Sequence, residues 1–194
     1  MAVELDLPFW FGQRRAVSAP PVAPTSGDAA LVAAARGGDR AAFGQLYTNY
    51  GRMVHGILLT RVPPGEVADL VQDVFLAAMR QIHTLREDGA FGGWLAMIAR
   101  NRATDYFRRA AEKTELPEDL GRSDPPETEA NAALRVIQSL PDAYSETLLL
   151  RLVEGMTGPE IAVRTGLTPA SVRVNLHRGM KMLREKLGWS QGHE

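Results

Sequence analysis

The hydrophobic residues of this chain recur at spacings of three and four, the period of an amphipathic α-helix. One stripe follows Asp39, a residue suited to capping a helix, and ends before Pro63. Its members are Phe43, Leu46, Tyr47, Tyr50, Val54, Ile57 and Leu58. Two more stripes follow, over residues 70–82 and 91–106. Together they predict a compact helical module over residues 28–111.

A second set of helical patterns begins near Glu129. Pro159 begins a short helix, Gly166 makes a turn, and Thr168 caps a last helix that runs to about Leu187. A short helix, a turn and a longer basic helix are typical of a helix-turn-helix. Nothing in the chain alternates with the period of a strand. We therefore predict an all-α fold of two small helical domains. The expected divisions are an N-terminal extension (1–27), the first domain (28–111), a flexible acidic linker (112–128) and the second domain (129–194).

The net charge gives no sign of a polyanionic partner, because 22 Lys and Arg are balanced by 23 Asp and Glu. The distribution is uneven, however. Residues 100–109 hold four arginines and one acid, and residues 169–187 hold five bases and one acid. Between them, residues 112–129 hold seven acids and two bases. This pattern indicates two polyanion-facing modules on a linker, although each basic run could instead be a solvated helix face.

Composition excludes several other classes of protein. Without cysteine there is no disulfide framework, thiolate metal site or cysteine nucleophile. The histidines, His55, His83, His177 and His193, lack the spacing of metal ligands. We therefore expect no enzymatic activity, no metal and no cofactor. Because no apolar run reaches about twenty residues and no signal peptide is visible, we expect a cytoplasmic protein that does not insert into membranes.

The last helix has the two faces that a reader of the DNA major groove needs. Val172, Leu176, Leu183 and Leu187 form its supporting stripe. Arg173, His177 and Lys181 recur every fourth residue on another side. Thr168 and Ser171 place hydroxyls and backbone N–H groups where a phosphate could bind. DNA binding is the favoured interpretation of this helix.

Two sets of motifs stand in the order and spacing of a known family. The first set is Asp69-Leu70-Val71-Gln72-Asp73-Val74-Phe75-Leu76, Phe91, Trp94-Leu95, Ile98-Ala99-Arg100-Asn101-Arg102-Ala103 and Asp105-Tyr106-Phe107-Arg108-Arg109. The second set is Leu140-Pro141, Gly155-Met156-Thr157, Glu160-Ile161-Ala162, Gly166-Leu167, Ser171-Val172-Arg173 and Leu176-His177-Arg178-Gly179. They resemble regions 2 and 4, respectively, of the extracytoplasmic-function (ECF) sigma factors of bacterial RNA polymerase.

This resemblance implies that the first module binds the promoter −10 element and the second the −35 element. The implied −10 residues are Leu85, Arg86, Asp88, Ala90, Asn101, Arg102, Asp105, Arg108 and Arg109. The implied −35 residues are Thr168, Ser171, Arg173, Val174, Asn175, His177, Arg178 and Lys181. The implied polymerase-binding residues are Asp69, Gln72, Asp73 and Phe75. Trp94 is in phase with the core, and Tyr106 suits either the core or stacking on a base.

The resemblance also implies the partners. These are core RNA polymerase, through the clamp helices of its largest subunit and its flap region, together with promoter DNA and an anti-sigma factor. The expected function is that of a sigma factor, which directs the core enzyme to specific promoters. The alternative is a stand-alone helix-turn-helix transcriptional regulator, which would leave residues 69–109 unexplained.

The N-terminal extension allows two interpretations. Its prolines and small residues are typical of a disordered tail. Its first part, however, carries Leu5, Leu7, Phe9, Trp10 and Phe11. Such a row of large apolar side chains could dock on a sigma module, the polymerase or an anti-sigma factor.

Overall fold

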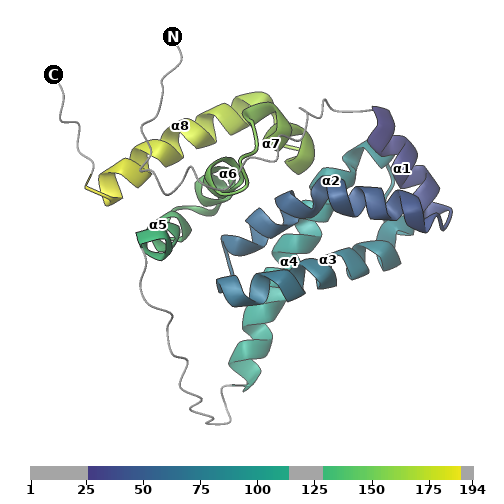
Figure 1. The fold of residues 1–194 in the computed structure, drawn as a ribbon, viewed down its shortest axis with the longest axis horizontal. Helices are drawn as coiled ribbons and strands as arrows, with labels where there is room; N and C mark the ends of the chain where they lie inside the picture. The colour runs from purple at the N-terminus through teal and green to yellow at the C-terminus, as the bar shows by residue number, and fades with distance from the viewer. Residues whose placement is uncertain (1–25, 114–128, 189–194) are drawn as a thin grey trace.

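The computed structural model describes residues 26–113 and 129–188, which form eight α-helices and three short 3-10 helices (Figure 1). The α-helices are α1 (Ser26–Arg36), α2 (Arg40–Leu59), α3 (Val67–Gln81), α4 (Phe91–Lys113), α5 (Glu129–Gln138), α6 (Asp142–Leu152), α7 (Gly158–Thr165) and α8 (Pro169–Lys186). The 3-10 helices are η2 (Pro64–Glu66), η3 (Ile82–Thr84) and η4 (Asp88–Ala90). These two ranges contain no strand, so the predicted all-α fold is confirmed. The interpretations of residues 1–25 and 114–128 lie outside the described residues.

Helices α1 to α4 form the first module, around the core that the apolar stripes predict. Asp39 caps α2, since its carboxylate accepts hydrogen bonds from the backbone N–H groups of Ala41 and Ala42 at 2.8 and 3.1 Å. The buried side chains include Leu46, Val54, Ile57 and Leu58 of α2, Val71, Val74 and Ala78 of α3, and Phe91, Leu95 and Ile98 of α4. Two members of the stripes, Tyr47 and Met79, are instead 43% exposed.

Helices α5 to α8 form the second module, in which α6 is the central helix. Six consecutive residues of α6, from Ser145 to Leu150, are buried. They are buried on all sides because α6 lies between α8 of its own module and α2 of the first module (Figure 1). Three of the six are leucines, Leu148 to Leu150, and the other three are polar. Within the described ranges, no helix is both long and apolar enough to cross a lipid bilayer.

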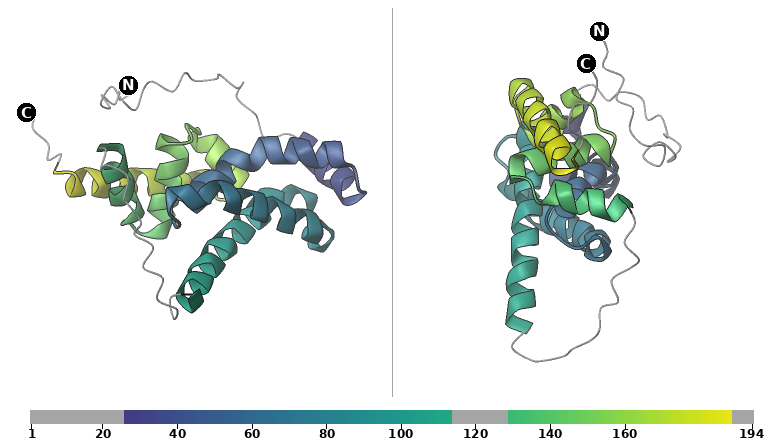
Figure 2. Two further views of the ribbon diagram at one scale, coloured as in Figure 1. Left: turned by 60° about the horizontal axis from the view of Figure 1, so that its bottom comes forward. Right: turned by 90° about the vertical axis from the view of Figure 1, so that its left-hand side faces the viewer.

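The two modules are in direct contact, which the sequence did not predict. α2 packs against α6, and α4 packs against α7 (Figures 1 and 2). At Gly56 of α2 a Cβ atom would lie 2.7 Å from Cδ2 of Leu150. At Gly92 of α4 it would lie 2.2 Å from the backbone oxygen of Arg164. Gly92 is therefore required for the close approach of α4 to the backbone of α7, whereas at Gly56 the Leu150 side chain would have to move.

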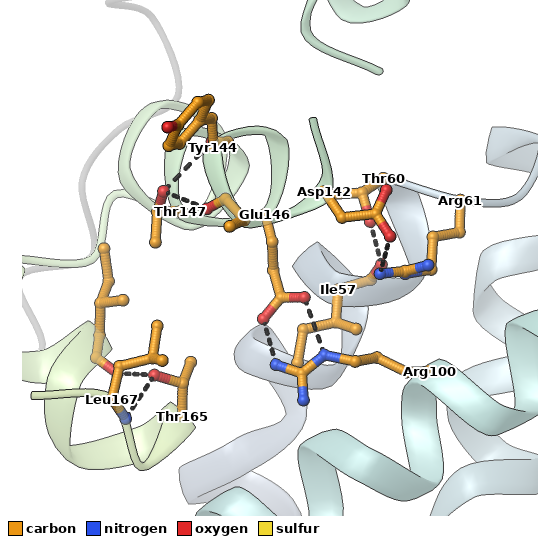
Figure 3. A network of polar contacts seen from close by, with 12 residues as sticks. Ile57, Thr60, Arg61, Arg100, Asp142, Tyr144, Glu146, Thr147, Thr165 and Leu167 are labelled. Atoms are coloured by element: carbon orange, nitrogen blue, oxygen red, sulfur yellow. Dashed lines mark hydrogen bonds and ion pairs between the residues drawn. The ribbon is translucent and has the colours of Figure 1, made fainter. Parts of the chain in front are cut away.

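Polar groups also pair across this boundary. Arg100 of α4 donates two hydrogen bonds to the carboxylate of Glu146, at 3.0 and 2.6 Å (Figure 3). These bonds raise the pKa of Arg100 above its ordinary value. Further contacts between the modules join Arg61 to Asp142 at 2.7 Å, His55 to Glu154 at 2.6 Å, and the side chain of Gln138 to the backbone oxygen of Leu59 at 2.7 Å.

We expect Gly92→Ala to separate the modules. The added methyl group would meet the backbone oxygen of Arg164, which cannot rotate away, and Cε1 of Tyr50 at 3.1 Å. The matched control is Gly93→Ala, because its nearest neighbour, the oxygen of Thr165, lies at an ordinary 3.5 Å. Both changes give α4 the same gain in helix propensity, about 1 kcal/mol. Small-angle X-ray scattering should show a larger radius of gyration for Gly92→Ala alone; equal radii would contradict this account of the interface.

Candidate nucleic-acid interface

Helices α7 and α8 form the predicted helix-turn-helix. Thr157 and Glu160 cap α7 reciprocally: the Thr157 hydroxyl accepts from the Glu160 N–H at 3.3 Å, and the Thr157 N–H donates to the Glu160 carboxylate at 2.7 Å. Gly166 ends α7 with φ +75°, a left-handed conformation that favours glycine. Thr168 then caps α8 by accepting a hydrogen bond from the N–H of Ser171 at 3.1 Å.

The outer face of α8 presents the predicted −35 residues to solvent. Thr168, Ser171, Arg173, Val174, His177, Arg178 and Lys181 are exposed, and Asn175 is half-buried. The two ends of the set differ in chemistry. The first turn offers the hydroxyls of Thr168 and Ser171, and the following turns offer cations. This face can contact both phosphates and base edges.

The inner face of α8 is fixed against α6. Val172 and Leu183 are buried, and Leu176 is half-buried. Gly179 belongs to this face, because a Cβ atom there would lie 3.0 Å from Cδ1 of Leu148 and 3.2 Å from Cβ of Tyr144. A glycine inside a helix costs about 1 kcal/mol relative to alanine. Here it allows α8 to lie close to α6, which sets the position of the outer face.

The predicted strand-contacting part of α4 is mostly open. Asn101, Arg108 and Arg109 are exposed, whereas Arg102 and Asp105 are half-buried. The carboxylate of Asp105 lies 3.1 Å from Arg108, its neighbour one turn on. The side chains in this part of α4 therefore form a mixed, mainly cationic surface.

Arg100 has a different role from the other arginines of α4. Its side chain is 35% exposed, and it faces the carboxylate of Glu146, which is only 7% exposed. From the sequence, Arg100 would be expected to belong to an exposed cation cluster on α4. Because the modules pack together, its side chain points to the second module instead. No sequence signal could have identified this pair, because the two residues are 46 positions apart.

The loop before α4 has a buried anchor and an exposed edge. Leu85 is buried, and Arg36 of α1 donates to its backbone oxygen at 2.9 Å and also pairs with the carboxylate of Asp88. Arg86 and Ala90 are exposed. Of the predicted −10 residues in this loop, Arg86 and Ala90 are therefore accessible, whereas Leu85 supports the loop from within.

A cavity of about 600 Å³ opens beside this loop. It is lined by the loop, by Trp94 and Met97 of α4, and by Val163 and Gly166 of the second module. Trp94 is half-buried against Phe91, with their ring centroids 5.7 Å apart. Its side chain thus contributes both to the core and to the cavity wall.

The predicted polymerase-binding face of α3 is exposed at Asp69, Gln72 and Asp73. Phe75 does not share this face: it is 3% exposed and packs on Tyr47, with ring centroids 4.5 Å apart. It positions α3 rather than offering a surface. Leu76, which is 51% exposed, continues the face instead. The helical period from Asp69 through Gln72 and Asp73 leads to Leu76, so the sequence did carry this signal.

Comparison with known proteins agrees with this architecture. The model of Sigma-70 region 2 matches residues 46–113, and that of Sigma-70, region 4 matches residues 130–183. The ECF RNA polymerase sigma-E factor of Haemophilus influenzae is 31% identical over 179 residues, which cover 82% of this chain and 95% of the relative. RNA polymerase sigma factor CarQ of Myxococcus xanthus is 32% identical over 162 residues, which cover 79% and 93%.

Solved structures with the same fold include CnrH in complex with the cytosolic domain of CnrY. It aligns with a TM-score of 0.58 and 28% identity, over 85% of this chain and 99% of that chain. The sigma factor RpoE of Bartonella quintana, in complex with the anti-sigma factor NepR, aligns with a TM-score of 0.51 over 76% and 97%. At 15% identity, that second match bears on the fold alone.

These matches show that the chain belongs to the sigma-70 family of transcription initiation factors. Two ECF RNA polymerase sigma-E factors match most of its length, and the chain is an RNA polymerase sigma factor of that group. The predicted resemblance and function are thereby confirmed. A stand-alone helix-turn-helix regulator is not favoured, because a sigma region matches the first module as well.

The cap of α7 predicts a stability that depends on pH. The N–H and hydroxyl of Thr157 both donate to Glu160 and hold the pKa of that carboxyl below its usual value. The resulting stabilisation is present above the pKa of the unfolded carboxyl and is lost as pH falls through the lower, folded pKa. Thr157→Ala should therefore lower the free energy of unfolding by about 1 kcal/mol at pH 7. Urea unfolding should show a smaller loss at an acid pH at which Glu160 is protonated in the folded protein.

Thr168→Ala is the matched control for this measurement. The Thr168 hydroxyl caps α8 through Ser171 and, within residues 26–113 and 129–188, hydrogen-bonds to no carboxylate. The cost of its removal should thus be the same at both pH values. If the two variants respond alike to pH, the Thr157–Glu160 hydrogen bonds do not cause the effect.

Proposed function

We propose that α8 reads the −35 element of the promoter with its outer face. The proposed contact residues are Thr168, Ser171, Arg173, Val174, Asn175, His177, Arg178 and Lys181. The observation that carries this proposal is the combination of a buried, glycine-fitted inner face with an exposed cationic outer face on one capped helix. Arginine can address guanine with two hydrogen bonds, and asparagine can address adenine in the same way.

The first module, in this proposal, reads and opens the −10 element. Opening requires a site for an unstacked base and cations that hold the separated strand. Arg86 and Ala90 of the loop line the cavity, and Asp88 lies between two lining residues, Glu87 and Gly89. Leu85 also lines the cavity and is their buried support. Asn101, Arg102, Asp105, Arg108 and Arg109 of α4 complete the proposed set.

Core RNA polymerase binds the exposed face of α3 in this proposal. Asp69, Gln72 and Asp73 suit the clamp helices of the largest subunit, and Leu76 adds an apolar contact. We assign the flap region of the polymerase to the second module. The proposed functional divisions remain those of the sequence, namely 28–111 and 129–194, with 112–128 as the connection.

The protein is proposed to act in the cytoplasm, as a DNA-binding factor without enzymatic activity of its own. An anti-sigma factor is a proposed partner. In support of such a partner, CnrH, which is similar to this chain over 85% of its length, is found in complex with another protein, the cytosolic domain of CnrY.

Both promoter elements can be bound together only after the modules separate. Two duplex turns correspond to about 70 Å. In the structure, by contrast, α4 contacts α7, and an ideal Cβ on Gly166 lies 3.3 Å from Cα of Gly93. Separation of the modules is therefore part of the proposed mechanism.

A reversible disulfide tests this step. The chain has no cysteine, so in the double variant Gly93→Cys, Gly166→Cys the introduced pair is the one intramolecular disulfide that can form, and the monomeric oxidised product is the one assayed. With core polymerase and genomic promoter fragments, the oxidised variant should lose most of its transcript, and reduction should restore it. Each single variant, treated in the same way, controls for the substitutions. Equal transcription by the oxidised and reduced double variant would contradict the proposed separation.

A substitution on α8 tests the −35 assignment. Arg173→Ala removes an exposed cation from the outer face and should cost about 1–3 kcal/mol of binding, or roughly tenfold or more, at promoters mapped by in-vitro transcription. Lys186→Ala removes an exposed cation near the other end of α8, outside the proposed contact set. It should change promoter binding much less. An equal loss in both variants would mean that Arg173 contributes only through its positive charge, and it would contradict a specific contact with the −35 element.

A further inference from the structure

The cavity beside the −10 loop is formed by both modules. Trp94 and Met97 come from α4, and Val163 and Gly166 come from α7 and its turn. Met97 and Val163 are large apolar residues that are 51% and 39% exposed. Apolar side chains of two modules thus face one opening of about 600 Å³, which has room for more than one aromatic side chain.

The rim of the cavity carries no dominant charge. Arg86 and Glu87, one residue of each sign, both contribute to its lining. A ligand would therefore be selected by burial of apolar surface rather than by charge. Large apolar side chains on a short extended segment suit such a site.

The chain enters the described structure close to this cavity. Asp28, in the first turn of α1, accepts hydrogen bonds from Asn49 at 3.0 Å and from the hydroxyl of Tyr50 at 2.9 Å. The ring of Tyr50 lies 4.9 Å from the guanidinium of Arg164, at the contact between α4 and α7. Gly92 meets Tyr50 there, and the next residue, Gly93, lines the cavity.

We propose that residues 5–11 of the same chain occupy this cavity and hold the two modules together. Five of these seven residues are large and apolar: Leu5, Leu7, Phe9, Trp10 and Phe11. Residues 12–25, which join them to α1, can span at most about 46–50 Å. A tethered segment of this kind acts at an effective concentration in the millimolar range, so it outcompetes a dilute partner of similar chemistry.

Binding of residues 5–11 in the cavity would affect transcription, and this consequence rests on the proposed function. The bound segment would cover the wall beside the −10 loop and bridge modules that have to separate. Residues 5–11 would then restrain the factor until the polymerase or DNA displaces them. If nine chains in ten are occupied, the apparent affinity for the promoter complex falls about tenfold.

Disulfide trapping tests the binding itself, without reference to transcription. In the otherwise cysteine-free full-length chain, Phe9→Cys is combined with Val163→Cys in the cavity wall. The matched control combines Phe9→Cys with Glu185→Cys, which is exposed near the far end of α8, a helix about 27 Å long. The cavity pair should form an intramolecular disulfide at least tenfold faster than the control pair. Equal rates, or a product with the mass of a dimer, would overturn the proposal.

A second experiment tests the restraint. Phe9→Ser with Trp10→Ser, and separately Val163→Ser, should each lower the concentration of factor needed for half-maximal transcription by about tenfold. Combining all three changes should give no further gain, because they remove the same contact. An unchanged midpoint in both variants would overturn the restraint. Absence of transcript from every variant and from the unchanged protein would instead count against the proposed function, and the trapping result would stand.

Discussion

The arrangement of the two modules depends on one charged pair, Arg100 with Glu146, in which the carboxylate is largely removed from water and the arginine side chain is 35% exposed. Desolvating two such groups costs about as much free energy as their attraction returns, so the pair adds little net stability. Its effect is on orientation. A buried Glu146 without Arg100 would cost several kcal/mol, about 3–5. The modules must therefore either meet in this register or separate and return both charges to water. This makes the contact specific and also reversible.

Shape complementarity supplies the rest of the contact. Gly92 lets α4 approach the backbone of α7 at a distance that no other residue would permit, and Gly56 lets α2 pack on Leu150 without displacing its side chain. The pair of Arg61 with Asp142 lies at the rim, where the Asp142 side chain is 74% exposed, and such pairs contribute about 0–1 kcal/mol. The interface thus combines close backbone packing with few strong polar anchors. Contacts of this kind between domains of one chain commonly allow relative motion.

The sequence predicts each module well and their contact not at all. The stripe of α2, the cap at Thr168 and the turn at Gly166 follow from local rules, because each depends on residues within one or two helical turns. The run Leu148-Leu149-Leu150 in α6 also carried a signal, since a continuous apolar run indicates a buried segment. By contrast, Arg100 is indistinguishable by sequence from its neighbouring arginines. Its partner lies on another module, and no periodicity encodes a pairing across a connecting segment.

The packed arrangement does not affect the two proposed DNA-reading surfaces equally. The outer face of α8 stays exposed while the modules are in contact. In α4, however, α7 packs on one side, and Arg100 is held by Glu146. A packed chain can therefore present the second module to duplex DNA before the first is fully available. In the proposed mechanism, separation then frees Arg100 at the point where separated strands would require additional positive charge. The same residue would thus hold the modules together in one state and add to the cationic surface of α4 in the other.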